Sequence, residues 1–279
     1  MRKDLDYQSS KWEKEKQKDI KRYRQLKGGN PILKNMELIL SYEKNKSWED
    51  INYVQCYTSL HLKYRILAER AYLQDNSDSQ AIYYTYLSGL AGILSYLIDS
   101  INPTINRDKT DQENLLYAFS YSIVQFFAIQ NNIPQCLGRI EHPYTQLFLG
   151  YYEKAVELLP YTSSTYDPTK PYTILMGDES RATVQAMAYK DENALNDLLI
   201  QHVKTYRKQP IDYSTFIDAY STAYIKLAQQ NGLKCGLDII EIPKIFFDKD
   251  SCKISIEKAQ LPFFNEAIKY LKTQGFEWY

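Results

Sequence analysis

The chain has 279 residues, of which 44% are hydrophobic and 26 are tyrosine. This length and composition allow a large buried core, which argues against disorder and favours one extended helical domain or two closely packed halves. Lys plus Arg and Asp plus Glu both number 34, so the net charge is zero and the overall charge gives no support for nucleic-acid binding.

The N-terminal segment is charged from its first residues. Its start, Met1 to Asp4, lacks the apolar core of a secretory signal, so we expect a cytoplasmic protein of bacterial type. Residues 10–27 favour a helix, and up to Lys34 eleven basic residues face five acidic ones. Because Lys and Glu alternate there, a solvated helix face is a better interpretation than an anion-binding surface.

Three capping boxes mark the starts of further helices. They read Ser47-Trp48-Glu49-Asp50, Ser77-Asp78-Ser79-Gln80 and Thr110-Asp111-Gln112-Glu113. The helices expected behind them cover residues 51–73, 80–101 and 115–130, the second ending before Asn102-Pro103. The uncharged run from Gln80 to Ile98 contains too many tyrosines and serines for a lipid-spanning helix, so we expect a buried helix and no membrane partner.

The middle of the chain contains the longest connection. A short helix over residues 135–141 and a helix over about 144–159 are expected before it, the latter closed by Pro160. The segment from Tyr161 to Gly177 is rich in Ser, Thr, Tyr and Pro and is expected to lack regular structure. Long ordered loops are often functional or separate subdomains. We therefore expect helical subdomains over 1–160 and 161–279 that form one continuous globular unit.

Helical periodicity is clearest after this loop. Asp178 is a candidate N-cap for a helix over 179–189, and Asp191 for the next helix, which carries His202 on its apolar face. A further helix over 213–230 is expected to end at Asn231-Gly232 and to pair antiparallel with its predecessor.

The pattern changes again near the C-terminus. Residues 237–256 contain short extended stretches, where Pro243 restricts any strand to a sheet edge, and a last helix is expected over 261–273. The fold class predicted from these elements is all-α. It is an irregular multi-helix bundle or α-solenoid-like array with a short extended or β-hairpin segment near the C-terminus.

Residues suited to catalysis or metal binding are few and scattered. The histidines are His61, His142 and His202, and the cysteines are Cys56, Cys136, Cys235 and Cys252. None forms a metal-binding or redox spacing, and no phosphate-binding glycine loop or nucleophile motif occurs. We expect no metal, no cofactor and no enzymatic activity, with His61 packed or at the surface and His202 in the core. Capping and turns explain the carboxylate pairs Asp178-Glu179 and Asp248-Asp250.

The tyrosines allow two interpretations. Tyrosine supplies large, amphipathic contact area and is enriched at binding hot spots. The chain is also rich in Lys, Asn and Ile, a composition that codon bias alone produces, and many tyrosines lie at core edges with the hydroxyl in water. Tyr161, Tyr166 and Tyr172, in the long connection, are the strongest candidates for partner contacts.

Two similarities to known proteins emerge. Residues 152–160 look like the second helix of a tetratricopeptide unit, but no second copy follows. The order of packing residues over about 178–247 resembles the bacterial polymorphic-toxin immunity proteins, in particular the immunity protein 49 family and, more distantly, the PoNi-type immunity proteins. The residues concerned are Ala182 to Tyr189, Asp191, Leu195, Leu198, Leu199, His202, Tyr206, Arg207, Phe216, Ala219, Ala223, Leu227, Ala228, Gly232, Ile242 and Pro243.

This resemblance implies a cytosolic, mostly helical protein that binds a cognate toxin or effector and blocks it without catalysis. We expect contacts from Tyr161, Tyr166, Asp167, Tyr172, Asp178 and Glu179, whose carboxylates can pair with a cationic toxin surface. The alternative is a tetratricopeptide-like helical scaffold that binds peptides or several proteins. The sequence leaves the oligomeric state and the chemistry of the toxin open.

Overall fold

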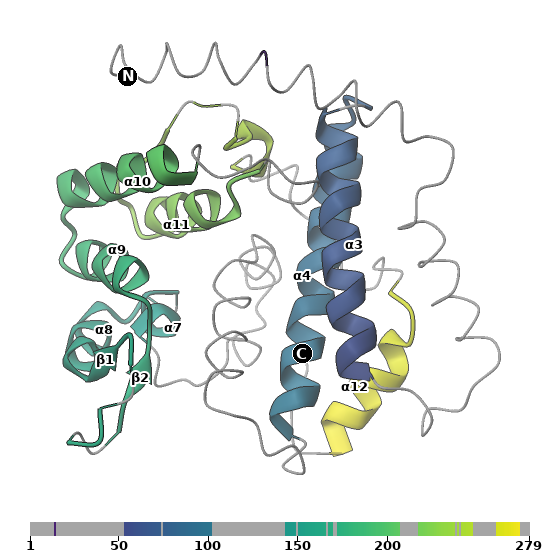
Figure 1. The fold of residues 1–279 in the computed structure, drawn as a ribbon, viewed down its shortest axis with the longest axis horizontal. Coiled ribbons are helices and arrows are strands. Elements are labelled where there is room, and N and C mark those ends of the chain that lie inside the picture. Colours follow the sequence, from purple (N-terminus) through teal and green to yellow (C-terminus); the bar gives the residue numbers. More distant parts are fainter. Residues whose placement is uncertain are drawn as a thin grey trace.

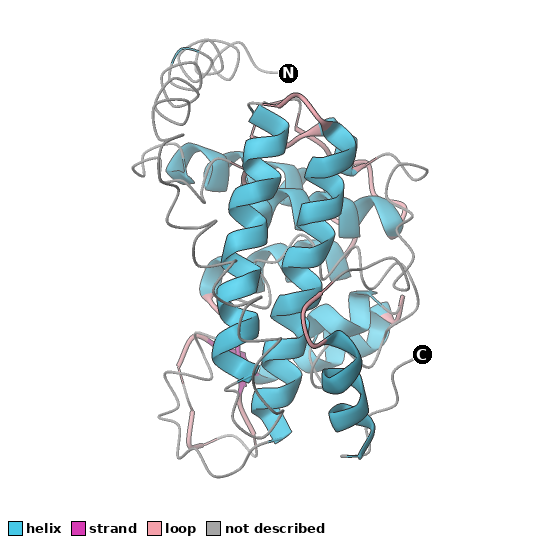
Figure 2. Cartoon of the chain, turned by 90° about the vertical axis from the view of Figure 1, so that its right-hand side faces the viewer, coloured by secondary structure: helices cyan, strands magenta, loops and turns pink. Residues whose placement is uncertain are grey.

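The computed structural model describes Lys14 and residues 53–73, 75–101, 143–148, 150–165, 167–169, 172–206, 217–237, 239, 241–247 and 261–273. Helices make up most of this part of the chain (Figure 2), which confirms the all-α expectation. The helices expected over 115–130 and 135–141, nearly all of the N-terminal helix, the first and third capping boxes and His142 lie outside the described residues. Within the described ranges, every helix is too short or too polar to cross a bilayer.

Two long helices, α3 (Tyr53–Leu73) and α4 (Asp78–Ile101), stand side by side (Figure 1). Both follow the predicted periodicity, and α4 begins inside the predicted capping box. The apolar stripe of α4 is buried at Leu87, Leu90, Leu94 and Ile98. The expected packing of a buried helix is therefore confirmed.

Small residues on α4 let α3 approach closely. Nδ1 of His61 lies 2.8 Å from the carbonyl oxygen of Ser88, which can only accept, so Nδ1 carries the proton. The Ser88 hydroxyl in turn donates to the His61 carbonyl at 2.8 Å. Burial lowers the pKa of His61 to about 4, so the ring stays neutral. His61 is thus a packed residue between two helices, as expected.

Except for α12 (Phe264–Thr273), which packs against α4, the other described helices form a second group beside this pair (Figure 1). They are α7 (Pro143–Phe148), α8 (Tyr152–Leu158), the 3-10 turn η4 (Leu159–Tyr161), α9 (Asp178–Ala188), α10 (Glu192–Tyr206) and α11 (Ala219–Gln230). Their shared core includes Leu147, Ala155, Val184, Met187, Leu195, Leu199, Val203, Tyr224 and Leu227. The predicted apolar face of α10 supplies three of these residues.

The single helix expected over 144–159 is wrong, because the chain breaks at Gly150. Gly150 has a φ of 80°. Its N–H donates to Leu147 and the next N–H donates to Gln146. This Schellman pattern ends α7 at a left-handed residue, which glycine adopts without a steric penalty.

Two predicted helix starts also need correction. Gly177 is the N-cap of α9, so Asp178 is its first helical residue instead of its cap. The helix expected from Tyr213 begins only at Ala219, because the Asp218 carboxylate accepts a hydrogen bond from the Ser221 N–H at 3.0 Å and caps α11.

Other local signals are confirmed. Oδ1 of Asp191 accepts from the N–H of Ala194 at 2.9 Å, so Asp191 caps α10 as expected. Gly232, with a φ of 78°, follows α11 in the left-handed conformation that the Asn231-Gly232 stop predicts.

Among the described residues, regular extended structure occurs in the long connection. β1 (Thr162–Ser163) pairs in parallel with β2 (Ile174–Leu175), with Thr162 opposite Ile174. In the C-terminal region, the described residues 241–247 contain the 3-10 turn η5 (Lys244–Phe246) and no strand. Residues 248–260, the second half of the expected hairpin, lie outside the described part.

Contacts join the two groups of helices. The N–H of Ile217 donates to Oε1 of Glu69 on α3 at 3.3 Å. The last helix, α12 (Phe264–Thr273), is attached to the first group: it contacts α4, and the hydroxyl of Tyr57 on α3 donates to the carbonyl of Pro262, just before α12, at 3.1 Å. The proposed boundary at residue 160 stays a prediction, although both sides of it contribute to these contacts.

A double-mutant cycle tests the close approach of α3 and α4. A Cβ at Gly92 would lie 3.2 Å from Nδ1 of His61. Because Ser88 holds this ring, we expect Gly92→Ala to lower the free energy of unfolding by about 1 kcal/mol despite its better helix propensity. In a His61→Ala background the same change should become stabilising. Urea unfolding of the four proteins measures this, and equal effects in both backgrounds would refute the contact.

Candidate functional site

Two of the predicted tyrosines of the long connection contact each other. The rings of Tyr161 and Tyr172 stack with centroids 4.6 Å apart and an interplanar angle of 17°. Tyr172 is 42% exposed, whereas Tyr161 is half-buried. Tyr166 lies outside the described residues. The structure therefore brings two of the three predicted tyrosines together.

Asp167 has a local role in this loop. Its Oδ1 accepts hydrogen bonds from the N–H and the hydroxyl of Thr169, at 3.0 and 2.6 Å. Its own N–H donates to the Thr173 hydroxyl at 3.1 Å, and this hydroxyl lies 3.1 Å from the Asp167 carbonyl. These bonds form an Asx turn and tie the two limbs of the loop together. The hydrogen bonds of Asp167 are thus made with Thr169 and Thr173 of the same segment.

The two predicted acidic residues at the start of α9 have different surroundings. The Asp178 side chain is 70% exposed and lies 3.2 Å from Nη2 of Arg181, one helical turn away. The Glu179 side chain is 49% exposed, and its Oε1 lies 2.5 Å from Nδ1 of His202 on α10. Asp178 is therefore a surface residue, whereas Glu179 connects the surface to the interior.

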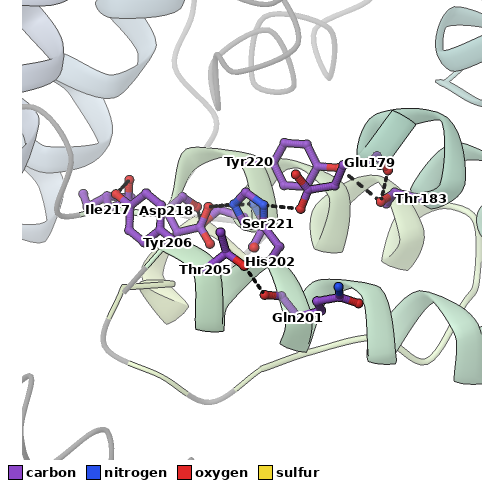
Figure 3. Close-up of polar contacts among 11 residues, drawn as sticks. Glu179, Thr183, Gln201, His202, Thr205, Tyr206, Ile217, Asp218, Tyr220 and Ser221 are labelled. Atoms are coloured by element: carbon purple, nitrogen blue, oxygen red, sulfur yellow. Dashed lines mark hydrogen bonds and ion pairs between the residues drawn. The ribbon is translucent and has the colours of Figure 1, made fainter. Parts of the chain in front are cut away.

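His202 also contacts a second carboxylate on the opposite side of its ring (Figure 3). Its Nε2 lies 3.4 Å from Oδ1 of Asp218, a distance and geometry of an ion pair and not of a well-aligned hydrogen bond. The Asp218 side chain is only 1% exposed. One imidazole therefore links α9, α10 and the residue that caps α11. We call Glu179, His202 and Asp218 the carboxylate–histidine bridge.

The bridge keeps His202 charged at neutral pH. Burial of the ring lowers its pKa, but the contacts with Asp218 and Glu179 outweigh this effect and raise the pKa to about 9. An isolated buried carboxylate is unfavourable, so the imidazolium compensates Asp218. The bridge as a whole carries one net negative charge.

Tyrosines surround the imidazole. Tyr220 stacks on His202 with centroids 4.2 Å apart, and Tyr206 lies 6.1 Å away. Burial, together with nearby charges, raises the pKa of both phenols, so they stay protonated. The Tyr206 hydroxyl donates to the Ile217 carbonyl at 3.2 Å, and the Tyr220 hydroxyl lies 3.1 Å from that of Thr183. The tyrosines therefore act here as packed, neutral hydrogen-bonding groups.

The backbone around Asp218 is fixed by neighbouring elements. The Asp218 N–H donates to the carbonyl of Glu241 at 2.8 Å. The preceding N–H, of Ile217, bonds to Glu69 on α3. Lys226, further along α11, donates to the Phe246 carbonyl at 2.6 Å. The start of α11 is thus a polar junction inside an otherwise apolar core.

This geometry favours a structural or binding role over proton transfer. An imidazolium with a pKa near 9 is a poor general base at neutral pH. The Nε2 of His202 faces Asp218. The Ser221 hydroxyl, a possible nucleophile, is fully buried and has no hydrogen-bond partner among the described residues, so no base contacts it there. The described ranges contain no cluster of three His, Cys, Asp or Glu residues arranged to hold a metal.

The sequence placed His202 on the correct helix face but missed its two carboxylate partners. Glu179 and Asp218 are distant in sequence and lie on different elements, so periodicity gives no signal for their contacts. Asp218 itself offered a weak signal, since an aspartate three residues before Ser221 fits an N-cap. No protein-family model, curated protein or solved structure matches the chain.

The raised pKa of His202 predicts how stability depends on pH. The imidazolium stabilises the fold fully below the unfolded pKa of 6.5, and this contribution is lost as pH rises through about 9. We expect a loss of about 2–3 kcal/mol between pH 6 and pH 10, after allowing for solvent around Glu179. His202→Gln should remove this slope. Chemical denaturation at several pH values tests it, and an unchanged slope in the variant would exclude His202 as its source.

Substitution of Asp218 separates charge from capping. Asn keeps an acceptor for the Ser221 N–H but removes the charge, whereas Ala removes both. We expect Asp218→Ala to cost about 3 kcal/mol or more and Asp218→Asn about 1–2 kcal/mol. Asn should also lower the pKa of His202, measured by NMR titration of its ring. An Asn variant as stable as the parent would show that the ion pair contributes nothing.

Proposed function

We propose that this chain is a protein inhibitor that binds one cognate bacterial toxin or effector stoichiometrically and blocks it without catalysing a reaction. The observation that supports this most is the stack of Tyr161 and Tyr172 in the connection between α8 and α9, which presents the exposed ring of Tyr172 on its partner Tyr161. A contact residue that is already held in place loses less entropy on binding.

Tyrosine is well suited to such a contact. It supplies a large amphipathic surface with few rotatable bonds and is enriched among residues that dominate binding energy. The stack restrains the Tyr172 ring before any partner arrives, and the bonds of Asp167 restrain the backbone beside it. In this proposal Tyr172 is the central contact, and Asp167 acts by shaping the loop.

The charge near the start of α9 suggests the chemistry of the partner surface. Asp178 and Glu179 are exposed and begin α9, which follows β2 after two residues. Arg181 offsets part of this charge. Since the bridge keeps one net negative charge, a cationic patch on the partner is complementary to this end of α9.

The identification of the partner as a toxin rests on the resemblance to immunity proteins. Most of the described packing residues that carry it fall on α9, α10 and α11, the three helices that the bridge connects. Gly232, Ile242 and Pro243 follow α11, and Arg207 and Phe216 lie outside the described residues. The alternative helical scaffold would bind several partners weakly. Affinity purification with a tagged chain, followed by a toxicity assay with co-expressed partner, distinguishes one neutralised partner from many weak ones.

Paired tyrosine substitutions test the proposed surface. Against the isolated partner, Tyr172→Ala should weaken binding by about 2 kcal/mol, roughly thirtyfold, because a packed aromatic contact is lost. Tyr189→Ala is the matched control, since Tyr189 is 60% exposed but lies at the other end of α9. Calorimetry measures both affinities. A larger loss for the control, or none for Tyr172, would place the binding surface elsewhere.

A further inference from the structure

The carboxylate of Glu179 lies at the boundary between the surface and the core. Half of its side chain is exposed, and Oε1 contacts His202, whose far side contacts buried Asp218. The other oxygen, Oε2, has no hydrogen-bond partner among the described residues. Both oxygens of a carboxylate accept hydrogen bonds, so the contact of Oε1 with His202 restricts the direction in which Oε2 points.

We propose that His202 is a positioning residue for partner binding: it holds Oε1 of Glu179 and so orients Oε2 to accept a hydrogen bond from an arginine or lysine of the protein partner. This inference rests on the proposed function. It connects Glu179, at the surface, to Asp218 at the buried start of α11.

The surroundings of His202 support a positioning role. Asp218 is fixed by its cap to Ser221 and by its N–H bond to Glu241, and Tyr220 covers a face of the ring. The imidazole therefore has little freedom to reorient. Pre-organised groups of this kind strengthen binding because the complex needs no further ordering.

Asp178 provides an internal comparison. It precedes Glu179 on the same turn of α9 and carries the same charge, but its described ion pair is with Arg181 at the surface. Removing either carboxylate changes the net charge equally. Of the two, only Glu179 contacts His202. Substituting each position in turn therefore distinguishes an effect of positioning by His202 from a general effect of negative charge.

Binding and the protonation of His202 must then be linked. A partner cation at Glu179 repels the imidazolium and lowers the pKa of His202 below its free value of about 9. By reciprocity, affinity rises as pH increases toward that value. Besides Glu179, the described titratable or charged groups that act on His202 or on the tyrosines packed against it are Asp218, Tyr206, Tyr220, Tyr224, Arg65, Glu69 and Glu241. The raised phenol pKa values keep Tyr206 and Tyr220 neutral in this range.

The experiment uses an acetylated, amidated tetra-arginine peptide as the probe, because arginine stays charged throughout the pH range. NMR follows the His202 ring signals and the peptide affinity of the full chain from pH 6.5 to 9.5. We expect the peptide to lower the pKa of His202, and the affinity to rise about three- to eightfold over this range, as a shift of about half to one pKa unit requires.

Variants complete the test. Glu179→Gln should weaken peptide binding and remove the response of His202, whereas Asp178→Asn should retain both the response and the pH dependence. His202→Gln, which keeps an N–H donor, should bind the peptide without the pH dependence. If circular dichroism shows that this variant does not fold, the comparison of Glu179→Gln with Asp178→Asn still tests the proposal.

Equal weakening by the Glu179 and Asp178 substitutions, or binding that leaves the pKa of His202 unchanged, would overturn the positioning role. Absence of any peptide binding would overturn it too. None of these results affects the proposed inhibition, which is tested separately with the isolated partner and the Tyr172 and Tyr189 variants.

Discussion

Burial of the Asp218 carboxylate is the constraint on which the C-terminal helices depend. A charge that is 1% exposed is tolerated only when it is paired and hydrogen-bonded. His202 supplies the opposite charge from α10, and the Ser221 N–H supplies the hydrogen bond that starts α11. Because the same imidazole contacts Glu179, one side chain sets the relation of three helices. Apolar contacts between these helices bury surface area, but they are not directional and do not by themselves specify how one helix is positioned along another.

The junction at Asp218 also extends to the long helices. Ile217 bonds to Glu69 on α3, and Tyr206 bonds to Ile217, so α3, α10 and α11 meet at one backbone segment. The two described histidines serve this architecture in opposite charge states. Between α3 and α4, burial keeps His61 neutral, and its N–H bonds to a backbone carbonyl. Between α9 and α11, two carboxylates keep His202 charged. The partner groups, and not the type of residue, decide which form is stable.

The sequence predicted some features that are determined within a few residues and missed others, and it gave no signal where distant residues decide. Asp191 and Gly232 act on their own helix ends, so they were placed correctly. The helix predicted over about 144–159 includes Gly150, whose positive φ ends α7. Asp218 was assigned to a helix interior because the apolar periodicity of α11 extends before its cap. The bridge was not predicted, since it joins three separate elements whose packing no local pattern specifies. Of the candidate contacts, the sequence correctly grouped Tyr161 and Tyr172 in one loop but could not show that their rings stack.

The position of Glu179 explains why the carboxylate–histidine bridge, which stabilises the fold, is also where we propose that the protein partner binds. Residues that only stabilise the core are best enclosed completely, because exposure to water weakens an ion pair. Glu179 instead remains half exposed, in the first turn of α9. Its interaction with His202 is therefore weaker than that of an enclosed pair, but its orientation is better defined than that of a free surface carboxylate. A protein partner that contacts this residue meets a negative group held in place by the core, and the strength of that contact depends on the charge of His202.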